Sequence, residues 1–333
     1  MTTLNIGLLG AGRIGKVHGA AISETAGARL AAVADAVPES ANELALMHGA
    51  EVCSIEEIMD DASIDAVFIT TPTDMHADLI EDAARRGKTI FCEKPIDLSV
   101  DRVRKCLAVV AEHDATLMVG FNRRFDPNFK QVRDHIDSGA IGDVEMVNII
   151  SRDPGPPPLS YMERSGGLFK DMTIHDFDMA RFLLGEEPVA VTAVGSVLVD
   201  PEIATVPDID SAAVTLVTAS GKIAQISNSR RASYGYDQRI EVHGSTGMVR
   251  ADNLHETTVQ LATSAGYHTT PLMNFFLERY MPAYRAEVQL FVDVVTNGAV
   301  LTATGDDGLR SLVLAEAAAR SVSEGRTISV DEI

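Results

Sequence analysis

Three glycines near the beginning of the chain have the spacing of a phosphate-binding turn. An apolar run, residues 4–9, leads directly into Gly10, Gly12 and Gly15. Where a strand turns into a helix, Gly10 would make the tight turn, Gly12 would let a pyrophosphate approach the backbone, and Gly15 would let the helix pack closely on the strand. The N–H groups and the positive dipole at the helix start would bind the phosphates. The predicted phosphate loop comprises Gly10, Gly12, Arg13, Ile14 and Gly15.

An acidic residue at the expected distance supports this interpretation over an ordinary glycine-rich turn followed by a surface aspartate. A strand-like run, residues 29–34, ends at Asp35, which lies 20 residues beyond Gly15. A carboxylate at this place accepts hydrogen bonds from the ribose hydroxyls and repels a 2′-phosphate. The sequence therefore predicts NAD, rather than NADP, as the cofactor.

A lysine follows the apolar run at residues 89–92, where the core would be better served by valine or isoleucine. Ligands of open parallel sheets bind at the carboxyl ends of the strands, which is where Lys94 would lie. Partly desolvated and near the positive nicotinamide ring, its ammonium would shift toward the neutral form and could transfer a proton or donate to a substrate hydroxyl. The alternative is a lysine with a buried stem and a solvated ammonium.

Three titratable residues recur with helical spacing further along the chain. In a helix ended by Gly185, Asp171, His175 and Asp178 would lie on one face, and a carboxylate one turn away can orient an imidazole and raise its pKa. The alternative is a solvated helix face beside an apolar stripe. Two carboxylates and one histidine without a nearby cysteine are a poor zinc set, and hydride transfer needs no metal, so we expect none.

The composition limits the classes of partner. A net charge of −20 and a pI near 4.8 argue against nucleic acid and against an anionic membrane surface, and they leave a small-molecule substrate open. No apolar run approaches the ~18 residues of a membrane span. Three scattered cysteines are too few for a disulfide framework, so we expect a reducing, cytoplasmic location.

The elements that must position these residues fall into two groups. In the first, short strands alternate with amphipathic helices, which predicts an α/β doubly wound parallel sheet with helices on both faces, over a domain of residues 1–121. The predicted strands are residues 4–9, 29–34, 51–53, 65–70, 89–92 and 116–121. The predicted helices are residues 14–25, 39–48, 55–60, 75–86 and 100–113.

From about residue 143 the strands lengthen and alternate, which predicts a second α/β domain, residues 122–333, with an open-faced, largely antiparallel sheet. Its predicted strands are residues 144–150, 189–199, 211–218, 222–229, 238–243 and 258–262. Two helices are expected at residues 283–296 and 306–323, the latter with Asp306 or Asp307 as N-cap. A proline-rich loop that begins at Asp153 is expected at the rim of the pocket.

Several of these segments, in this order along the chain, resemble the glucose-fructose oxidoreductase and inositol dehydrogenase family. The resemblance extends to about residue 240 and implies a Rossmann domain, a second domain with an open-faced sheet, a homotetramer built through those sheets, and NAD-linked oxidation of a ring hydroxyl. The segments are residues 10–15, 71–73, 93–95 and 120–125, the pair Gly166 and Gly167 with Asp171 and His175, and residues 234–238.

The resemblance also implies roles for individual residues. Lys94, Asp171 and His175 would be catalytic, with His175 as the general base. Further cofactor contacts are expected from Thr71, Pro72, His76 and Glu93. The polyol would be bound by Arg124, Asp153, Tyr234 and Tyr236, and the motif does not decide which tyrosine faces the pocket.

The expected reaction converts a ring hydroxyl of a cyclitol such as myo-inositol to a ketone. Another cyclitol or sugar, such as scyllo-inositol or glucose, remains open because only the pocket shape separates them. A non-catalytic NAD-sensing regulator is a second alternative, which loss of Lys94 or His175 would favour, and both are present. A lyase or hydrolase that uses NAD transiently is the third.

Overall fold

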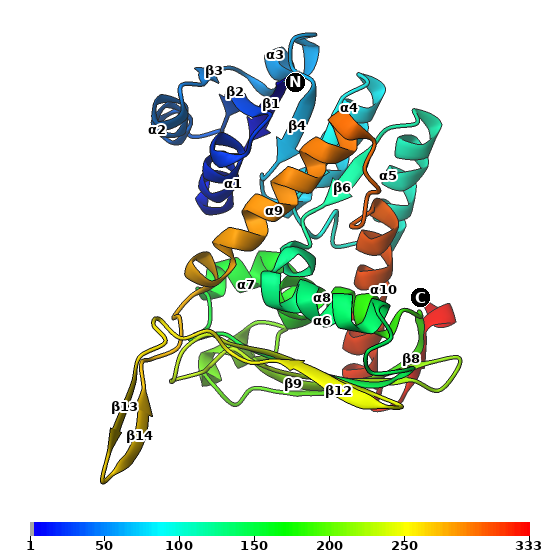
Figure 1. Ribbon diagram of the computed structural model, residues 1–333. Helices are drawn as coiled ribbons and strands as arrows, with labels where there is room; N and C mark the ends of the chain where they lie inside the picture. Colours follow the sequence, from blue (N-terminus) through cyan, green and yellow to red (C-terminus); the bar gives the residue numbers. More distant parts are fainter. Residues whose placement is uncertain (1–2) are drawn as a thin grey trace. The chain divides into compact units, whose positions relative to one another are not determined.

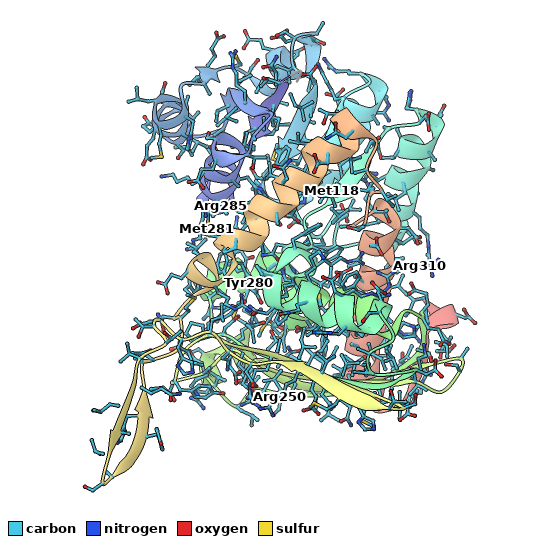
Figure 2. The ribbon with its side chains drawn as sticks, in the orientation of Figure 1. Met118, Arg250, Tyr280, Met281, Arg285 and Arg310 are labelled. Atoms are coloured by element: carbon cyan, nitrogen blue, oxygen red, sulfur yellow. The ribbon has the colours of Figure 1, made fainter. Side chains whose placement is uncertain are left out.

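The computed structural model describes residues 3–333, which form two compact units. The first extends to Phe125 and includes Met281–Leu312, and the second comprises Asp126–Tyr280 and Val313–Ile333. The chain passes from the second unit to the first inside helix α9 (Phe276–Asn297), between Tyr280 and Met281 (Figure 2). The predicted division at residue 121 differs in this respect, because residues 281–312 belong with the N-terminal sheet. Phe291 of α9 explains the difference, since its ring packs edge-on against Phe68 at 5.0 Å in the core of that sheet.

The first unit is the predicted doubly wound fold. Its sheet is entirely parallel, with the strand order β3-β2-β1-β4-β5-β6. The strands are β1 (Leu4–Leu9), β2 (Ala28–Ala34), β3 (Glu51–Val52), β4 (Ala66–Ile69), β5 (Thr89–Cys92) and β6 (Leu117–Val119). The helices between them are α1 (Arg13–Glu24), α2 (Pro38–His48), α3 (Ile55–Asp60), α4 (His76–Arg85) and α5 (Val100–Glu112). All six predicted strands are present.

Burial on both faces explains why these strands are continuous apolar runs. Every residue of β4 is fully buried, and the rings of Phe68 and Phe91 on neighbouring strands stack at 4.4 Å. Right-handed crossovers place α1 and α2 on one face and α4 and α5 on the other. The loops at the carboxyl ends of the strands therefore gather at one edge of the sheet.

The second unit has a seven-stranded sheet in the order β12-β11-β7-β10-β9-β8-β15, antiparallel except for the pair β7 and β10. Its strands are β7 (Val144–Arg152), β8 (Pro188–Ser196), β9 (Ser211–Thr218), β10 (Ile223–Ser229), β11 (Asp237–Gly244), β12 (Gly247–Ala251) and β15 (Ile328–Ser329). Its helices are α6 (Pro127–Asp137), α7 (Leu159–Ser165), α8 (Ile174–Leu184) and most of α10 (Gly305–Glu324). In the described chain the helices cover one face of this sheet and leave the other open (Figure 1). Short helical turns complete the chain: η1 (Thr73–Met75), η2 (Asn122–Phe125), η3 (Phe169–Thr173), η4 (Pro201–Thr205) and η5 (Val330–Glu332).

The predicted strand at residues 258–262 is not part of this sheet. Its counterpart, β13 (Gln260–Thr263), pairs with β14 (Gly266–Thr269) in a separate two-stranded hairpin whose residues are all exposed. The hairpin projects away from the seven-stranded sheet (Figure 1). The alternating sequence of this segment predicts a strand. Sequence periodicity does not say which other strand it pairs with.

The predicted N-cap of α10 is also wrong. The helix begins at Gly305, so Thr304 is the cap: its hydroxyl accepts from the Asp307 amide at 3.3 Å, and the Asp307 carboxylate accepts from the Thr304 amide at 2.8 Å. Asp307 therefore acts as the third residue of a capping box rather than as the cap. None of the helices described is long and apolar enough to cross a membrane.

Candidate active site

The turn from β1 into α1 needs two of its three glycines for steric reasons. Gly10 has a φ of +104°, and a Cβ there would lie 2.6 Å from the Thr70 carbonyl oxygen. A Cβ on Gly15 would lie 1.9 Å from the Gly10 carbonyl oxygen, so α1 crosses the loop at backbone contact. A Cβ on Gly12 would meet no described atom within 4 Å. The loop therefore leaves open space at the one glycine that the fold itself does not need.

The start of α1 is suited to an anion. Among the described residues no side chain caps Gly12, and the first turn of α1 holds no acidic residue. Its first N–H groups and its positive dipole are thus available to phosphate oxygens. The Thr71 hydroxyl is buried and has no hydrogen-bond partner among residues 3–333. Both features fit a pyrophosphate and an adjoining polar group of a dinucleotide.

Asp35 follows the last residue of β2 and is held by the backbone through both carboxylate oxygens. Oδ2 accepts from the Ala11 amide at 2.5 Å, and Oδ1 accepts from the Val37 amide at 2.7 Å. The carboxylate is therefore fixed against the glycine loop, where a negative charge meets the ribose of a dinucleotide.

Lys94 is the second residue after β5 and is half-buried between two buried neighbours, Glu93 and Pro95. The Glu93 carboxylate accepts from His18 Nε2 at 2.7 Å and from the Lys94 amide at 3.2 Å. A Cβ on Gly120 would come within 3.0 Å of this carboxyl group, so the glycine of the next loop is also in contact with it. Glu93 was predicted to bind the cofactor. These contacts of its carboxylate are with other groups of the protein.

His76, the first residue of α4, was likewise predicted to contact the cofactor. Its Nδ1 lies 2.8 Å from the Pro95 carbonyl oxygen, and its Nε2 lies 2.8 Å from the Thr71 carbonyl oxygen. Burial lowers the pKa of His76, against the opposing effect of these two carbonyls. Both ring nitrogens are therefore directed at loop backbone, and the ring joins the loop after β4 to the loop after β5.

In the second unit, Asp171 lies in the π-helical turn η3, which continues directly into α8. Its Oδ1 accepts from the Tyr161 hydroxyl at 2.9 Å, and its Oδ2 accepts from Arg230 at 3.2 Å. Arg230 is almost completely buried, so the ion pair is shielded from solvent. These contacts orient the Asp171 carboxylate.

The three titratable groups of the predicted stripe lie in different environments. Asp171 lies in the π-helical turn, where the spacing of 3.6 residues per turn that predicted the stripe does not hold. His175 is half-buried, whereas Asp178 is buried and lies 3.7 Å from Arg181 in an ion pair. The alternative prediction, an ordinary solvated helix face, is therefore wrong for this part of α8.

Sequence reasoning missed the residues that support this turn. Leu168 and Ile209 donate their amides to one oxygen of Asp208, each at 2.8 Å, and burial raises the pKa of Asp208. Gly167 has a φ of +80°, and a Cβ there would lie 2.8 Å from that carboxylate. The glycine pair before Asp171 was the available signal, but its partner lies 41 residues away.

Arg124 is held inside the first unit. It donates to Asp307 at 2.9 Å and to the Thr302 carbonyl oxygen, and the side chain is 7% exposed. These contacts join η2 to the start of α10. Its predicted role in polyol binding stays a prediction.

The two tyrosines of the 234–238 segment differ in environment. Tyr234 is exposed, donates to Asp237 at 2.6 Å and accepts from Arg152 at 3.2 Å. Tyr236 is buried and packs edge-on against Tyr280 at 5.9 Å. Tyr234 also borders an open hollow of about 560 Å³ at the base of the β13–β14 hairpin.

Asp153 follows β7, and its amide donates to the Ser229 carbonyl oxygen at 2.9 Å. The proline-rich loop that it begins is thereby tied to the end of β10. Within the described residues no group of three histidine, cysteine or acidic side chains is placed to hold a metal ion.

Comparison with known proteins agrees with these features. Residues 4–121 match a family described as oxidoreductases with an NAD-binding Rossmann fold, and residues 129–250 match the GFO/IDH/MocA C-terminal domain. The chain is 60% identical to inositol 2-dehydrogenase of Rhizobium meliloti strain 1021, over 98% of this chain and 99% of that one. This chain belongs to the GFO/IDH/MocA oxidoreductase family.

Solved structures of family members share the fold over the full chain. Myo-inositol dehydrogenase from Corynebacterium glutamicum ATCC 13032 is 44% identical with a TM-score of 0.94, covering 98% of each chain. Scyllo-inositol dehydrogenase from Lactobacillus casei, solved with bound NAD(H) and scyllo-inositol, is 31% identical with a TM-score of 0.92, covering 99% of this chain and all of that one. The family resemblance predicted from the motifs is thus confirmed. The chain is an NAD-dependent oxidoreductase that acts on a CH–OH group.

Proposed function

We propose that this GFO/IDH/MocA member oxidises a ring hydroxyl of myo-inositol to the ketone, with NAD as the hydride acceptor. The observation that carries the proposal is the 60% identity, over nearly the whole chain, to an inositol 2-dehydrogenase. The catalytic residues that the family motifs imply, Lys94, Asp171 and His175, are all present.

When bound, NAD accepts the hydride at C4 of its nicotinamide ring. His175 takes the hydroxyl proton as general base, so the carbon that loses the hydride becomes a carbonyl. Lys94 donates a hydrogen bond to the reacting oxygen. Asp171, oriented by Tyr161 and Arg230, favours the protonated form of the imidazole.

The polyol contacts of Arg124, Asp153, Tyr234 and Tyr236 are part of the proposal. Arg124 donates to Asp307 and to the Thr302 carbonyl oxygen, so its guanidinium is held in a fixed orientation. Hydrogen bonds to the non-reacting hydroxyls would decide which ring carbon faces the nicotinamide.

A panel of polyols tests the proposal directly. The purified protein would be given NAD with myo-inositol, scyllo-inositol or glucose, and NADH formation would be followed by absorbance. We expect the highest kcat/KM with myo-inositol. Preference for scyllo-inositol would favour the alternative cyclitol, which the solved scyllo-inositol dehydrogenase keeps open. NAD binding without turnover on any polyol would favour a non-catalytic regulator.

The role of His175 is tested by replacing it with alanine. Loss of a general base should lower turnover by about 10²- to 10⁴-fold. The affinity for NAD, measured by fluorescence titration, should change little because the imidazole acts on the substrate. Turnover within a few-fold of the wild type would show that His175 is only part of the α8 surface.

We further propose that the protein is a cytoplasmic homotetramer assembled through the open face of its second sheet. The three cysteines are free thiols, which suits a reducing compartment. Closed point-group symmetry is the usual arrangement of such assemblies, and the open face offers the uncovered area.

A further inference from the structure

Two buried histidines contact the residues on either side of Lys94. His18 belongs to α1 and His76 to α4, so they come from helices on opposite faces of the parallel sheet. One contacts Glu93, which precedes the lysine, and the other contacts Pro95, which follows it.

His18 is completely buried, and its Nε2 donates to the Glu93 carboxylate at 2.7 Å. Its ring packs among apolar and aromatic rings, with centroids 4.8 Å from Phe91 and 5.4 Å from Tyr284. In so apolar an environment a hydrogen bond to a carboxylate is strong, and an unpaired carboxylate is costly. The other oxygen of Glu93 accepts from the Lys94 amide at 3.2 Å, so the pair extends to the lysine backbone.

His76 is 2% exposed and contacts the other side of the lysine. Its Nδ1 faces the Pro95 carbonyl at 2.8 Å, and its Nε2 faces the Thr71 carbonyl at the same distance. Burial favours the neutral imidazole, which has one N–H, and a carbonyl oxygen can only accept, so His76 can donate to one of the two carbonyls. An apolar side chain could donate to neither.

The segment between these contacts lies just beyond the last ladder bond of β5. Strand β5 ends at Cys92, the Glu93 amide still donates to the Ile69 carbonyl oxygen of β4 at 3.0 Å, and Glu93, Lys94 and Pro95 are neither strand nor helix. Beyond this bond, the Lys94 amide donates to the Glu93 carboxylate and the Pro95 carbonyl oxygen faces His76. A misplacement of about 1 Å at a reacting group can lower a rate by roughly 10²-fold.

We propose that His18 and His76 are positioning residues that fix the backbone on both sides of Lys94 and so set where its ammonium meets the reacting oxygen. This inference rests on the proposed function, in which Lys94 acts on the substrate. Neither histidine needs to touch the cofactor or the polyol. Two ordinary core histidines would instead contribute to folding alone.

Substitutions of His76 separate the two contacts. His76→Asn keeps a donor near the place of Nδ1, His76→Gln keeps one near the place of Nε2, and His76→Phe keeps only the ring shape. We expect kcat to fall about 10- to 100-fold in H76F and H76Q and to be largely retained in H76N, with NAD affinity changed less than about threefold in all three. Equal kcat in H76N, H76Q and H76F would overturn the role of the Pro95 contact.

The matching pair for His18 is His18→Gln, which keeps a donor toward Glu93, and His18→Phe, which keeps the packing of the ring. We expect H18Q to retain kcat and H18F to lose it about tenfold. The control is His48→Phe: His48 is half-buried at the end of α2, and its Nε2 has no partner among the described residues. It should keep wild-type kcat, and a loss there as large as in H18F would contradict the proposal.

A readout independent of turnover distinguishes failure of this inference from failure of the proposed function. Lysines labelled by ¹³C reductive methylation give NMR signals, and that of Lys94 is assigned by its loss in Lys94→Ala. We expect the chemical shift and the titration of the Lys94 signal to change in H76F and H18F but not in H48F. The Tm of H76N should equal that of the wild type. A Lys94 signal that is unchanged in both H76F and H18F would overturn the proposal that the two histidines position Lys94, whatever substrate the enzyme uses.

A double-mutant cycle gives the kinetic counterpart. If the histidines act through Lys94, His76→Phe should cost no more than about twofold in kcat when Lys94 is already alanine. The same loss in both backgrounds would show that His76 acts independently of the lysine.

Discussion

The cofactor preference depends on one carboxylate. Asp35 has both oxygens bonded to backbone amides, of Ala11 and Val37, so it is fixed beside the glycine loop. A fixed negative charge at this place admits ribose hydroxyls and repels a 2′-phosphate.

Replacing Asp35 with serine, together with Ala36→Arg, should therefore relax the preference for NAD. We expect kcat/KM with NADP to rise at least tenfold while that with NAD falls, because the new arginine can pair with the 2′-phosphate. Both are measured with the same polyol. The single variant Ala36→Arg is the control, and it should keep the preference. A wild type equally active with both cofactors would show that Asp35 does not select.

A second carboxyl group, on α9, is buried with no hydrogen-bond partner among the described residues. Glu287 is fully buried, and neither of its oxygens has a hydrogen-bond partner among residues 3–333. Burial, with a smaller contribution from the charge of Glu93, raises the pKa of Glu287 well above its usual 4.5. Burial therefore favours the protonated form of this carboxyl group in the folded protein.

Holding that proton makes stability depend on pH. Above pH 4.5 the unfolded chain releases the proton and the folded chain keeps it, so the wild type loses stability as pH rises toward the folded pKa. Glu287→Gln cannot ionise, so its free energy of unfolding relative to the wild type should rise between pH 4.5 and pH 8. Urea unfolding at both pH values measures this. Glu287→Met should show the same trend, and a gap independent of pH in both variants would contradict it.

At the scale of elements, the turn from β1 into α1 separates folding from binding. Gly15 is needed where α1 crosses Gly10, whereas the space over Gly12 is open. Gly12→Ala should keep the Tm of the apo protein and weaken NAD binding by about tenfold or more, because the added methyl occupies the place of a phosphate. Gly15→Ala should lower both. Calorimetry and NAD titration test the pair, and equal effects of the two variants on Tm would refute the distinction.

The elements of the first unit could be predicted because each strand is a short apolar run bounded by turn residues. In the second unit, β12, β14 and β15 were missed, as were α6 and α7, since these short elements depend on partners distant in the sequence. The turn at Phe169–Thr173 could not be recognised as π-helical, because helical spacing assumes 3.6 residues per turn.

The sequence predicted which residues would be candidates for the site, but it did not predict the side-chain contacts that hold them. Asp35 and Lys94 follow their strands as the pattern predicts. The pairs that hold them, such as His18 with Glu93 and Arg230 with Asp171, join residues 75 and 59 positions apart. Such pairs are set by strand order, which one sequence does not reveal.

At the scale of the whole molecule, the open face of the second sheet has the character of an interface. Register places Val194 of β8, Ala213 of β9, Ser227 of β10 and Ile150 of β7 side by side in one row across it. Val194 is 70% exposed, and Ala213 is also exposed. The edge strand adds Arg250, on the side turned away from the helices (Figure 2). A small and apolar centre with a charged edge is the usual composition of a protein interface.

A charge placed at the centre of that row should therefore break the proposed tetramer. Ala213→Asp adds a carboxylate that would be buried without a partner between two sheets, at a cost of several kcal/mol in each copy. We expect light scattering to show dimers or monomers for this variant at micromolar concentration, with an unchanged far-UV circular dichroism spectrum, because in the single chain the site is open to water. Leu46→Asp is the matched control: Leu46 lies on α2, is 88% exposed and should leave the mass unchanged. A wild type that is monomeric at these concentrations, or a tetramer that survives Ala213→Asp, would place the interface elsewhere on the molecule.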